Sequence, residues 1–221
     1  ALDLSAYVTE REGYDFTGWY LDAALTQPIT SLTLEADTTV YAGWRIRNPF
    51  VDVAEKDYFY DAVLWGVENG VVKGMDETHF EPETVCTRAQ ALTFLWRANG
   101  MPQPKTTTNP FVDVDASAYY YDAVLWGVEN GIVKGMDETH FEPDTACSRA
   151  HALTFLWRAK GMPQASGTTF ADVPANAYYA QAVAWGVENG IVKGMDETHF
   201  EPDTLCQRAH AVTFLWRAYA N

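Results

Sequence analysis

A segment of about sixty residues occurs three times in this chain of 221 residues. The copies begin at Phe50, Phe111 and Phe170, so they are offset by 61 and then by 59 residues. Each contains WGVENG, VKGMDETHFEP, a cysteine and TFLWRA in that order. One copy is too short to enclose a core, so tandem copies bury their apolar faces against one another. With only three copies, we expect a closed pseudo-threefold body rather than an open solenoid.

Each copy has the pattern of a helix, a loop and a second helix. In the first copy, apolar spacing predicts a helix over 58–69, and Gly70 is placed to end it. The loop GMDETHFEPET follows, and a second helix is predicted over 88–98. The sequence therefore predicts a mainly helical fold for this part of the chain.

The start of the second helix differs among the copies. Thr87 and Gln90 fit a capping box, in which each side chain pairs with the other residue's backbone N–H. Ser148 keeps this N-cap in the second copy, whereas Gln207 is a poor N-cap, so we expect the third copy to have lost most of the device. A cation in the first turn opposes the helix dipole by roughly a few tenths of a kcal/mol. Another role must therefore account for the arginine that follows the N-cap in every copy: Arg88, Arg149 and Arg208.

Composition and charge narrow the possible partners. The chain is 48% hydrophobic, and its formal net charge is −15, with a pI of about 4.5. Such a surface repels nucleic acid and anionic lipid, and no apolar run approaches the ~20 residues of a membrane-spanning helix. The first residues lack the basic and apolar segments of a secretory signal, and we expect the chain to be a piece of a longer protein.

Three cysteines occupy equivalent places in the repeat, and they are too few for a disulfide framework: Cys86, Cys147 and Cys206. We expect them to pack as small buried side chains. Cys147 with His151, and Cys206 with His210, could each face a metal, but Gln90 takes the histidine's place in the first copy. No metal or other cofactor is expected. No hydrolase or phosphate-binding motif occurs, so we do not expect an enzyme.

The repeats resemble the S-layer homology family. The family pattern F-x-D-V is matched by FVDV at 50–53, FVDV at 111–114 and FADV at 170–173. GVVKG or GIVKG, HFEP, and the elements CTRAQ, CSRAH and CQRAH follow in order. The resemblance covers about four-fifths of the chain. It implies a three-pronged, pseudo-threefold body with binding grooves between the repeats.

The same resemblance implies a function at the bacterial cell surface. Such triplets anchor surface proteins non-covalently to the peptidoglycan-linked secondary cell-wall polysaccharide, often through its pyruvylated sugars. A pyruvate ketal carries a carboxylate, which a guanidinium binds with bidentate, charge-assisted hydrogen bonds. The arginine of the family motif falls on the three cations left unexplained by capping, and we expect these to contact the glycan: Arg88, Arg149 and Arg208.

Two further sets of candidate glycan-binding residues recur in the repeats. Nine of the 15 Lys and Arg residues occupy only three repeat positions, and one of these positions supplies Lys73, Lys134 and Lys193. The third position holds Arg97, Arg158 and Arg217, where a structural role is favoured. The alternative for all nine is pairing with nearby acids.

The chain departs from the family pattern at two positions. The family tryptophan is replaced by Tyr58, Tyr119 and Tyr178. These tyrosines can stack on a sugar, although core packing is favoured. The family glutamate is replaced by Gln90, His151 and His210. Each of these changes removes a negative charge, which either favours an anionic ligand or only alters the cap.

Residues 1–47 lie outside the repeats. GYDFTGWY and TTVYAGW resemble the Listeria–Bacteroides repeat, a small β-grasp-like module whose opening strand is missing or reduced here. Tyr14 to Tyr20 has a strand pattern, and two strands are expected on either side of Ala36 and Asp37. We therefore expect this module at 1–47, followed by repeats at 48–104, 105–165 and 166–221.

These features predict an extracellular cell-wall anchor that binds an acidic, possibly pyruvylated, secondary cell-wall polysaccharide. The alternative is an adhesive or self-assembling surface protein that binds an S-layer or host protein. Salt separates the two, because ionic glycan binding weakens as salt rises.

Overall fold

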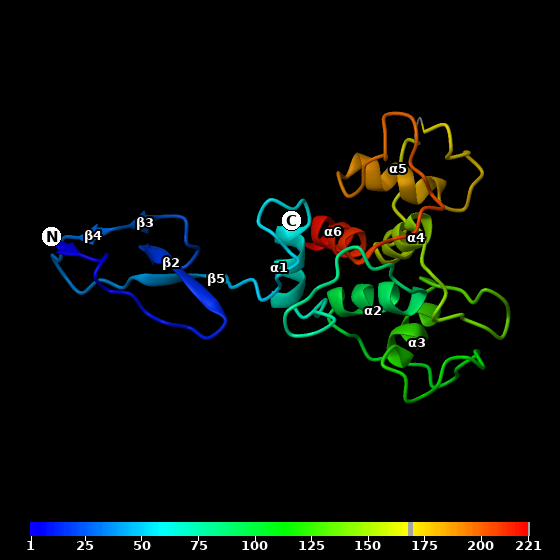
Figure 1. The fold of residues 1–221 in the computed structure, drawn as a ribbon, viewed down its shortest axis with the longest axis horizontal. Helices are drawn as coiled ribbons and strands as arrows, with labels where there is room; N and C mark the ends of the chain where they lie inside the picture. The colour runs from blue at the N-terminus through cyan, green and yellow to red at the C-terminus, as the bar shows by residue number, and fades with distance from the viewer. Residues whose placement is uncertain (168–169, 221) are drawn as a thin grey trace. The chain divides into compact units, whose positions relative to one another are not determined.

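The computed structural model describes residues 1–167 and 170–220, which form two compact units, Ala1–Pro49 and Phe50–Asn221. Six helices occur among the described residues, all in the second unit, and the strands lie in the first (Figure 1). This agrees with the predicted mainly helical repeats and the small β module. The helices are α1 (Tyr60–Glu68), α2 (Arg88–Ala98), α3 (Tyr121–Glu129), α4 (Arg149–Ala159), α5 (Ala180–Glu188) and α6 (Arg208–Tyr219).

The helix boundaries follow the predicted stop and start signals closely. α1 ends just before Gly70, whose φ of +67° suits a residue without a Cβ. It begins two residues later than predicted, because Asp57 organises a turn by accepting from the N–H of Ala54 and of Tyr60. The predicted span 88–98 of α2 is confirmed.

The predicted capping is confirmed in the first two copies and is wrong for the third. The Thr87 hydroxyl accepts from the N–H of Gln90, and Gln90 Oε1 accepts from the N–H of Thr87 at 3.1 Å. In α4 the Ser148 hydroxyl accepts from the N–H of His151, but the reciprocal bond is missing, because Nδ1 of His151 has no hydrogen-bond partner among the described residues. The third copy retains more of the device than expected, since the N–H of Gln207 donates to Nδ1 of His210 at 3.4 Å.

A ring of backbone hydrogen bonds joins the three repeats at their cysteines. The N–H of Cys86 donates to the carbonyl of Cys206, that of Cys147 to Cys86, and that of Cys206 to Cys147, all at 2.8–2.9 Å. All three side chains are fully buried, which confirms the predicted packing role. Each repeat is thus bonded to both others.

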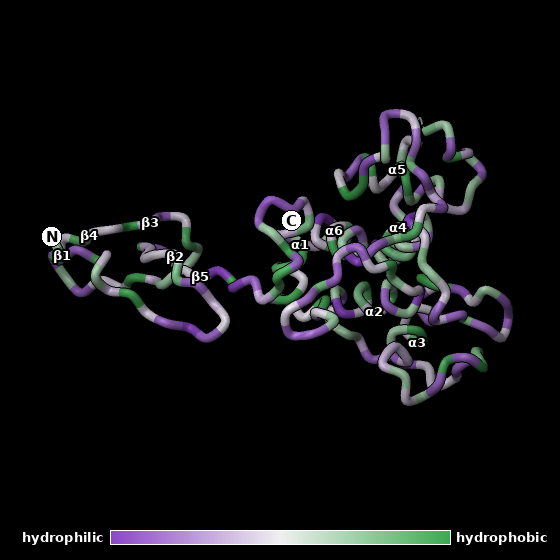
Figure 2. The backbone as a smooth tube through the Cα atoms, viewed as in Figure 1, coloured by the Kyte–Doolittle hydropathy of each residue, from purple (hydrophilic) through white to green (hydrophobic). Residues whose placement is uncertain are grey.

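The helices pack in pairs that cross from one repeat to the next. α3 packs on α2, α5 on α4 and α1 on α6, while α2, α4 and α6 contact one another (Figure 1). Hydrophobic segments follow these helices, and hydrophilic segments follow the outer loops (Figure 2). Each pair buries apolar side chains that neither repeat could bury alone, as expected for tandem units.

The aspartate of the F-x-D-V pattern fixes the loop of its own repeat. Asp52 accepts from the N–H of Phe80 at 2.9 Å and from the N–H of Glu81 at 2.7 Å. Asp113 and Asp172 do the same in the other copies. The ring of Phe80 is fully buried and packs against Phe50, so the loop is tied to the core at Phe80 and Glu81.

The N-terminal unit contains two small antiparallel sheets. β2 (Tyr14–Tyr20) lies between β3 (Pro28–Ile29) and β5 (Tyr41–Ile46), and β1 (Leu2–Asp3) pairs with β4 (Ser31–Leu32). The predicted strand at Tyr14 to Tyr20 is confirmed. Of the two strands expected around Ala36 and Asp37, the second is confirmed as β5, whereas the first is present only at Leu32, in β4 of the other sheet.

Candidate functional site

The three motif arginines are buried where one repeat meets the next. Arg88, at the start of α2, is only 2% exposed, and it reaches into the loop of the second repeat. Its Nε donates to the carbonyl of Phe141 at 3.0 Å, and its Nη2 donates to the carbonyl of Lys134 at 3.1 Å. The guanidinium also lies over the Phe141 ring, 4.7 Å from the ring centroid.

The same contacts recur around the ring of repeats. Arg149 donates to the carbonyls of Phe200 and Lys193 in the third repeat. Arg208 donates to Phe80 and Lys73 in the first repeat, which closes the ring. Burial lowers the pKa of each arginine. The partners of these hydrogen bonds are backbone carbonyls rather than carboxylates, so the arginines bind repeat to repeat.

A cavity of about 140 Å³ lies beside Arg88 and is lined from all three repeats. Arg88 comes from the first repeat, Lys134 and His151 from the second, and Tyr178 from the third. Arg158, from α4, completes the cationic lining. Three of the nine predicted glycan-binding residues therefore meet in one place. We call the site formed by these five residues the His151 groove.

The tyrosine and histidine of this groove stack on each other. The ring centroids of His151 and Tyr178 are 5.8 Å apart and their planes differ by 26°. Burial lowers the pKa of His151, and the nearby charge of Arg88 lowers it further, against a smaller opposing effect from Asp203. Burial and Arg88 therefore favour the neutral form of His151.

Equivalent groups come together at the other two repeat junctions. His210 stacks on Tyr58 at 6.3 Å, and burial together with Arg149 lowers the pKa of His210. At the remaining junction, Tyr119 lies within the electrostatic reach of Arg97 and Asp144. Gln90 occupies the histidine's position there, so the three junctions differ in this one side chain.

The tyrosines are not core residues, contrary to the favoured interpretation. Tyr58, Tyr119 and Tyr178 are 56%, 59% and 53% exposed, because each precedes its helix and lies at the groove edge. The lysine side chains of Lys73, Lys134 and Lys193 are exposed as well, while their carbonyls bind the arginines. One face of each tyrosine ring and the side chain of each lysine are therefore accessible to a ligand.

Two residues of the groove were not among the predicted ligands. The position of Arg158 was assigned a structural role, and Arg158 does donate from Nη1 to the carbonyl of Ile132 at 3.1 Å. It also lines the cavity. His151 was considered as a cap variant. The sequence signal for His151 is that it replaces the family glutamate two residues after the motif arginine Arg149.

The GMDETH loops hold hydrogen-bonded turns. Asp76 accepts from the N–H groups of Thr78 and His79, which hold the pKa of its carboxyl at about 2. No group of three or more His, Cys, Asp or Glu within 1–167 and 170–220 is arranged to hold a metal ion. Over the same residues, no helix is long and apolar enough to cross a membrane.

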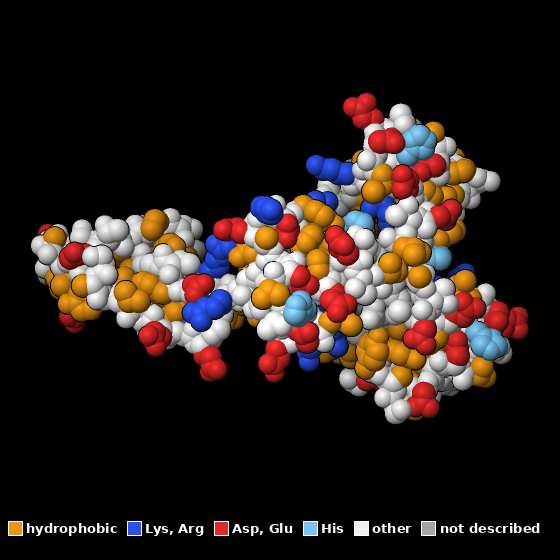
Figure 3. Space-filling model, viewed as in Figure 1, with side chains coloured by type: hydrophobic (Ala, Val, Ile, Leu, Met, Phe, Trp, Pro, Cys, Tyr) orange, Lys and Arg blue, Asp and Glu red, His pale blue; other side chains and the backbone are white. Residues whose placement is uncertain are grey.

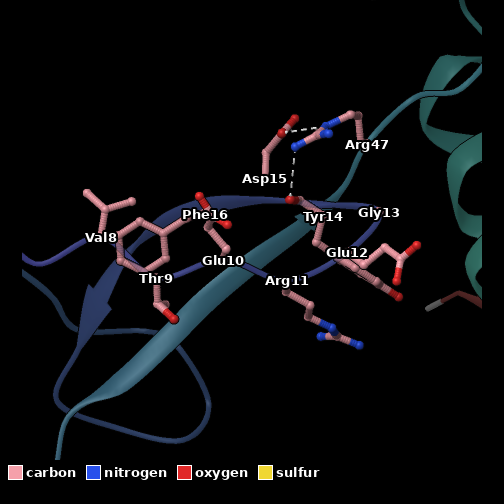
Figure 4. Close-up of a pocket in the computed structure, with 10 residues that line it drawn as sticks. All are labelled: Val8, Thr9, Glu10, Arg11, Glu12, Gly13, Tyr14, Asp15, Phe16 and Arg47. Carbon is pink, nitrogen blue, oxygen red and sulfur yellow. Dashed lines mark hydrogen bonds and ion pairs between the residues drawn. The ribbon is translucent and has the colours of Figure 1, made fainter.

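The N-terminal unit has a shallow open cavity of its own. The cavity is lined by the segment 8–16 and by Arg47 (Figure 4). Arg47 forms an ion pair with Asp15 at 2.9 Å. Arg11 lies 3.7 Å from the centroid of the Tyr14 ring. Asp15 and Arg47 are both exposed, so an ion pair of this kind contributes little stability.

Tandem helical repeats joined in a ring, with cationic and aromatic side chains at their junctions, define a class of repeat-built proteins. The S-layer homology domain profile matches residues 49–92, 110–153 and 169–212, which is more than half of the chain. The chain belongs to the S-layer homology family. The Listeria-Bacteroides repeat domain matches residues 3–43.

Several bacterial proteins are similar to this chain over the repeats. The surface-layer 125 kDa protein of Lysinibacillus sphaericus is 31% identical over 163 residues, covering 71% of this chain and 14% of that protein. The S-layer protein sap of Bacillus anthracis is 29% identical over 75% of the chain and 20% of its own length. The amylopullulanase of Thermoanaerobacterium thermosulfurigenes is 25% identical over 80% of the chain and 10% of its own length.

The chain therefore spans only about a tenth to a fifth of these relatives. The family and its surface-layer relatives place the chain at the bacterial cell surface. The amylopullulanase shows that the same repeats also accompany enzymes.

Proposed function

We propose that the three repeats form a pseudo-threefold, three-pronged anchor that holds a surface protein on the cell wall. The ligand is an acidic secondary cell-wall polysaccharide, bound at the junctions between repeats through a pyruvate ketal carboxylate. The observation that carries this proposal is the meeting of Arg88, Lys134 and Tyr178 from three repeats in one cavity. The repeats themselves serve binding rather than catalysis.

The charge distribution supports an anionic ligand. The chain carries 30 acidic residues against 15 basic ones, and acidic side chains are scattered over the face seen in Figure 3. Three cations nevertheless line the His151 groove. Arg88 spends two of its five N–H groups on described carbonyls, which leaves further donors for a carboxylate.

The test is co-sedimentation with isolated wall sacculi whose polysaccharide carries pyruvate ketals. A second batch is stripped of ketals by mild acid. Because the arginines also hold the repeats together, the groove variant changes only exposed side chains to alanine: Lys73, Lys134, Lys193, Tyr58, Tyr119 and Tyr178. A smaller control variant changes other exposed lysines and a tyrosine to alanine: Lys56, Lys105 and Tyr41.

We expect the control to bind intact walls as the unaltered chain does, and the groove variant to lose most binding. Walls stripped of ketals should bind the unaltered chain and the control poorly. Added salt should weaken the binding of both proteins to intact walls. Equal binding to stripped walls would exclude the ketal. Association of the chain that needs no wall and does not weaken with salt would instead favour an adhesive or self-assembling role with a protein partner.

A further inference from the structure

One position of the repeat carries a different residue in each copy and brings the three copies together. The segment TFLWRA is identical in all of them, and the residue that follows it is Asn99, Lys160 or Tyr219. These residues lie at the C-terminal ends of α2, α4 and α6, the three helices that contact one another. Tyr219 contacts both of the others, so this cluster, which we call the polar triad, joins all three repeats.

The contacts of the polar triad depend on the residues present. Nδ2 of Asn99 donates to the hydroxyl oxygen of Tyr219 at 2.9 Å and to the carbonyl of Leu95 at 2.8 Å, so both amide hydrogens are used. The ammonium nitrogen of Lys160 lies 3.5 Å from the centroid of the Tyr219 ring, which is a cation–π contact. Tyrosine meets both partners because it offers a hydroxyl and a ring face.

The junction between the third and first repeats is held differently from the other two. The first repeat is followed in the chain by the second, and the second by the third, so a linker keeps each of these pairs together. The third and first repeats are not consecutive, and the cysteines are free thiols, so this junction is closed by non-covalent contacts. A linker raises the effective concentration of its two repeats for each other, so the junction without one opens most readily. The hydrogen bond from Asn99 to Tyr219 spans this junction, across 120 residues of sequence.

We propose that Tyr219 acts as a latch, which keeps the junction between the third and first repeats closed through its hydroxyl. The same junction brings together one set of candidate glycan-binding residues. Arg208 donates to the carbonyl of Lys73 there, and His210 stacks on Tyr58. Closure of the latch therefore keeps this set assembled. The consequence for glycan binding rests on the proposed function, whereas the latch itself does not.

Two backbone amides report on the opening of two different junctions. The N–H of Arg208 donates to the carbonyl of Thr84 at 2.9 Å, between the third and first repeats. The N–H of Arg88 donates to the carbonyl of Thr145 at 2.9 Å, between the first and second repeats. Because these bonds are equivalent, hydrogen exchange compares the latched junction with a linked junction in the same molecule.

The main variant is Tyr219→Phe, which removes the hydroxyl and keeps the ring that contacts Lys160. Asn99→Ala removes the donor of the same hydrogen bond, and the double variant removes both partners. Tyr119→Phe is the matched control, because the Tyr119 hydroxyl forms no hydrogen bond with the residues that the structure describes. Native-state hydrogen exchange of each protein is followed by NMR at pH 7, without any glycan.

We expect Tyr219→Phe to raise the exchange rate of the Arg208 amide about two- to tenfold, which is the net effect of one hydrogen bond. The rate of the Arg88 amide should stay within about twofold of that in the unaltered chain. Asn99→Ala should act alike, and the double variant should add little to either change, because both remove the same bond. The control should alter neither rate.

Equal acceleration of both amides would overturn the latch, because the hydroxyl would then stabilise the whole repeat unit. Unchanged exchange of the Arg208 amide, or the same acceleration in the control, would overturn it as well. None of these results bears on glycan binding, so the anchoring proposal would still stand or fall by sedimentation with walls.

Discussion

Nε of Arg88 donates to the carbonyl oxygen of Phe141 at 3.0 Å, across 53 residues of sequence and from one repeat to the next. The residue that the family motif marks as a ligand is thus also a tie between repeats. Its head group is held on the Phe141 ring and at the Lys134 carbonyl, so the side chain is ordered before any ligand arrives. For the proposed glycan ligand, this preorganisation would reduce the entropy cost of binding.

Replacing Arg88 with alanine should destabilise the repeat unit by about 2–4 kcal/mol. Two buried carbonyls lose their donor, and the packing of the side chain on Phe141 is lost. Urea unfolding measures this. Lys134→Ala is the control, because its exposed side chain should cost less than about 0.5 kcal/mol. An Arg88→Ala protein as stable as this control would refute the structural role.

Replacing Asp52 with alanine should cost about 1–3 kcal/mol, because the N–H groups of Phe80 and Glu81 lose their acceptor. Thermal unfolding gives the difference. Glu77→Ala, in the exposed part of the same loop, should change stability little. If both variants unfolded alike, the loop would not depend on the aspartate.

The three cysteine thiols should resist thiol reagents in the folded chain. Burial raises the pKa of Cys86 and of Cys147 to about 12, and it raises that of Cys206 as well. The reactive thiolate is therefore scarce, and the sulfur atoms are covered. Reaction with a chromogenic disulfide reagent at pH 8 should be slow until urea unfolds the chain. Rapid labelling of any one thiol in the native chain would contradict the buried ring.

The GMDETH loops should contribute less to the stability of the fold in acid, over a defined range of pH. Asp76, Asp137 and Asp196 each have a pKa lowered from 3.8 to about 2 by backbone hydrogen bonds. A carboxyl with a lowered folded pKa stabilises the fold above its unfolded value, and this contribution fades as pH falls from about 4 towards 2. NMR titration of the side-chain carboxyls should give midpoints near 2. Midpoints near 3.8 would show that these hydrogen bonds do not form in solution.

Local sequence signals predicted the elements well. The Thr87 and Gln90 pair marked the start of α2, and Gly70 marked the end of α1, because caps are decided by neighbouring residues. Tyr58 was interpreted as a core residue because its aromatic ring suggested burial. Its position before α1, at a junction with another repeat, is set by long-range packing that periodicity does not encode.

Long-range packing also explains why the candidate site was predicted only in part. The repeated arginines, lysines and tyrosines were predicted as ligands, and Arg88, Lys134 and Tyr178 line one cavity. The resemblance implied grooves between repeats, but the sequence did not indicate that one cavity takes residues from all three. It also gave no sign that Arg158 would line the cavity while donating to Ile132, because that depends on how α4 lies against the neighbouring loop.

The most direct test of the central claim is an NMR titration of the chain with the ketal glycoside. We predict that chemical shifts change at the repeat junctions, at Lys134, Tyr178 and their equivalents, while the N-terminal unit around Tyr41 stays unchanged. Shifts confined to the N-terminal unit would contradict binding at the junctions.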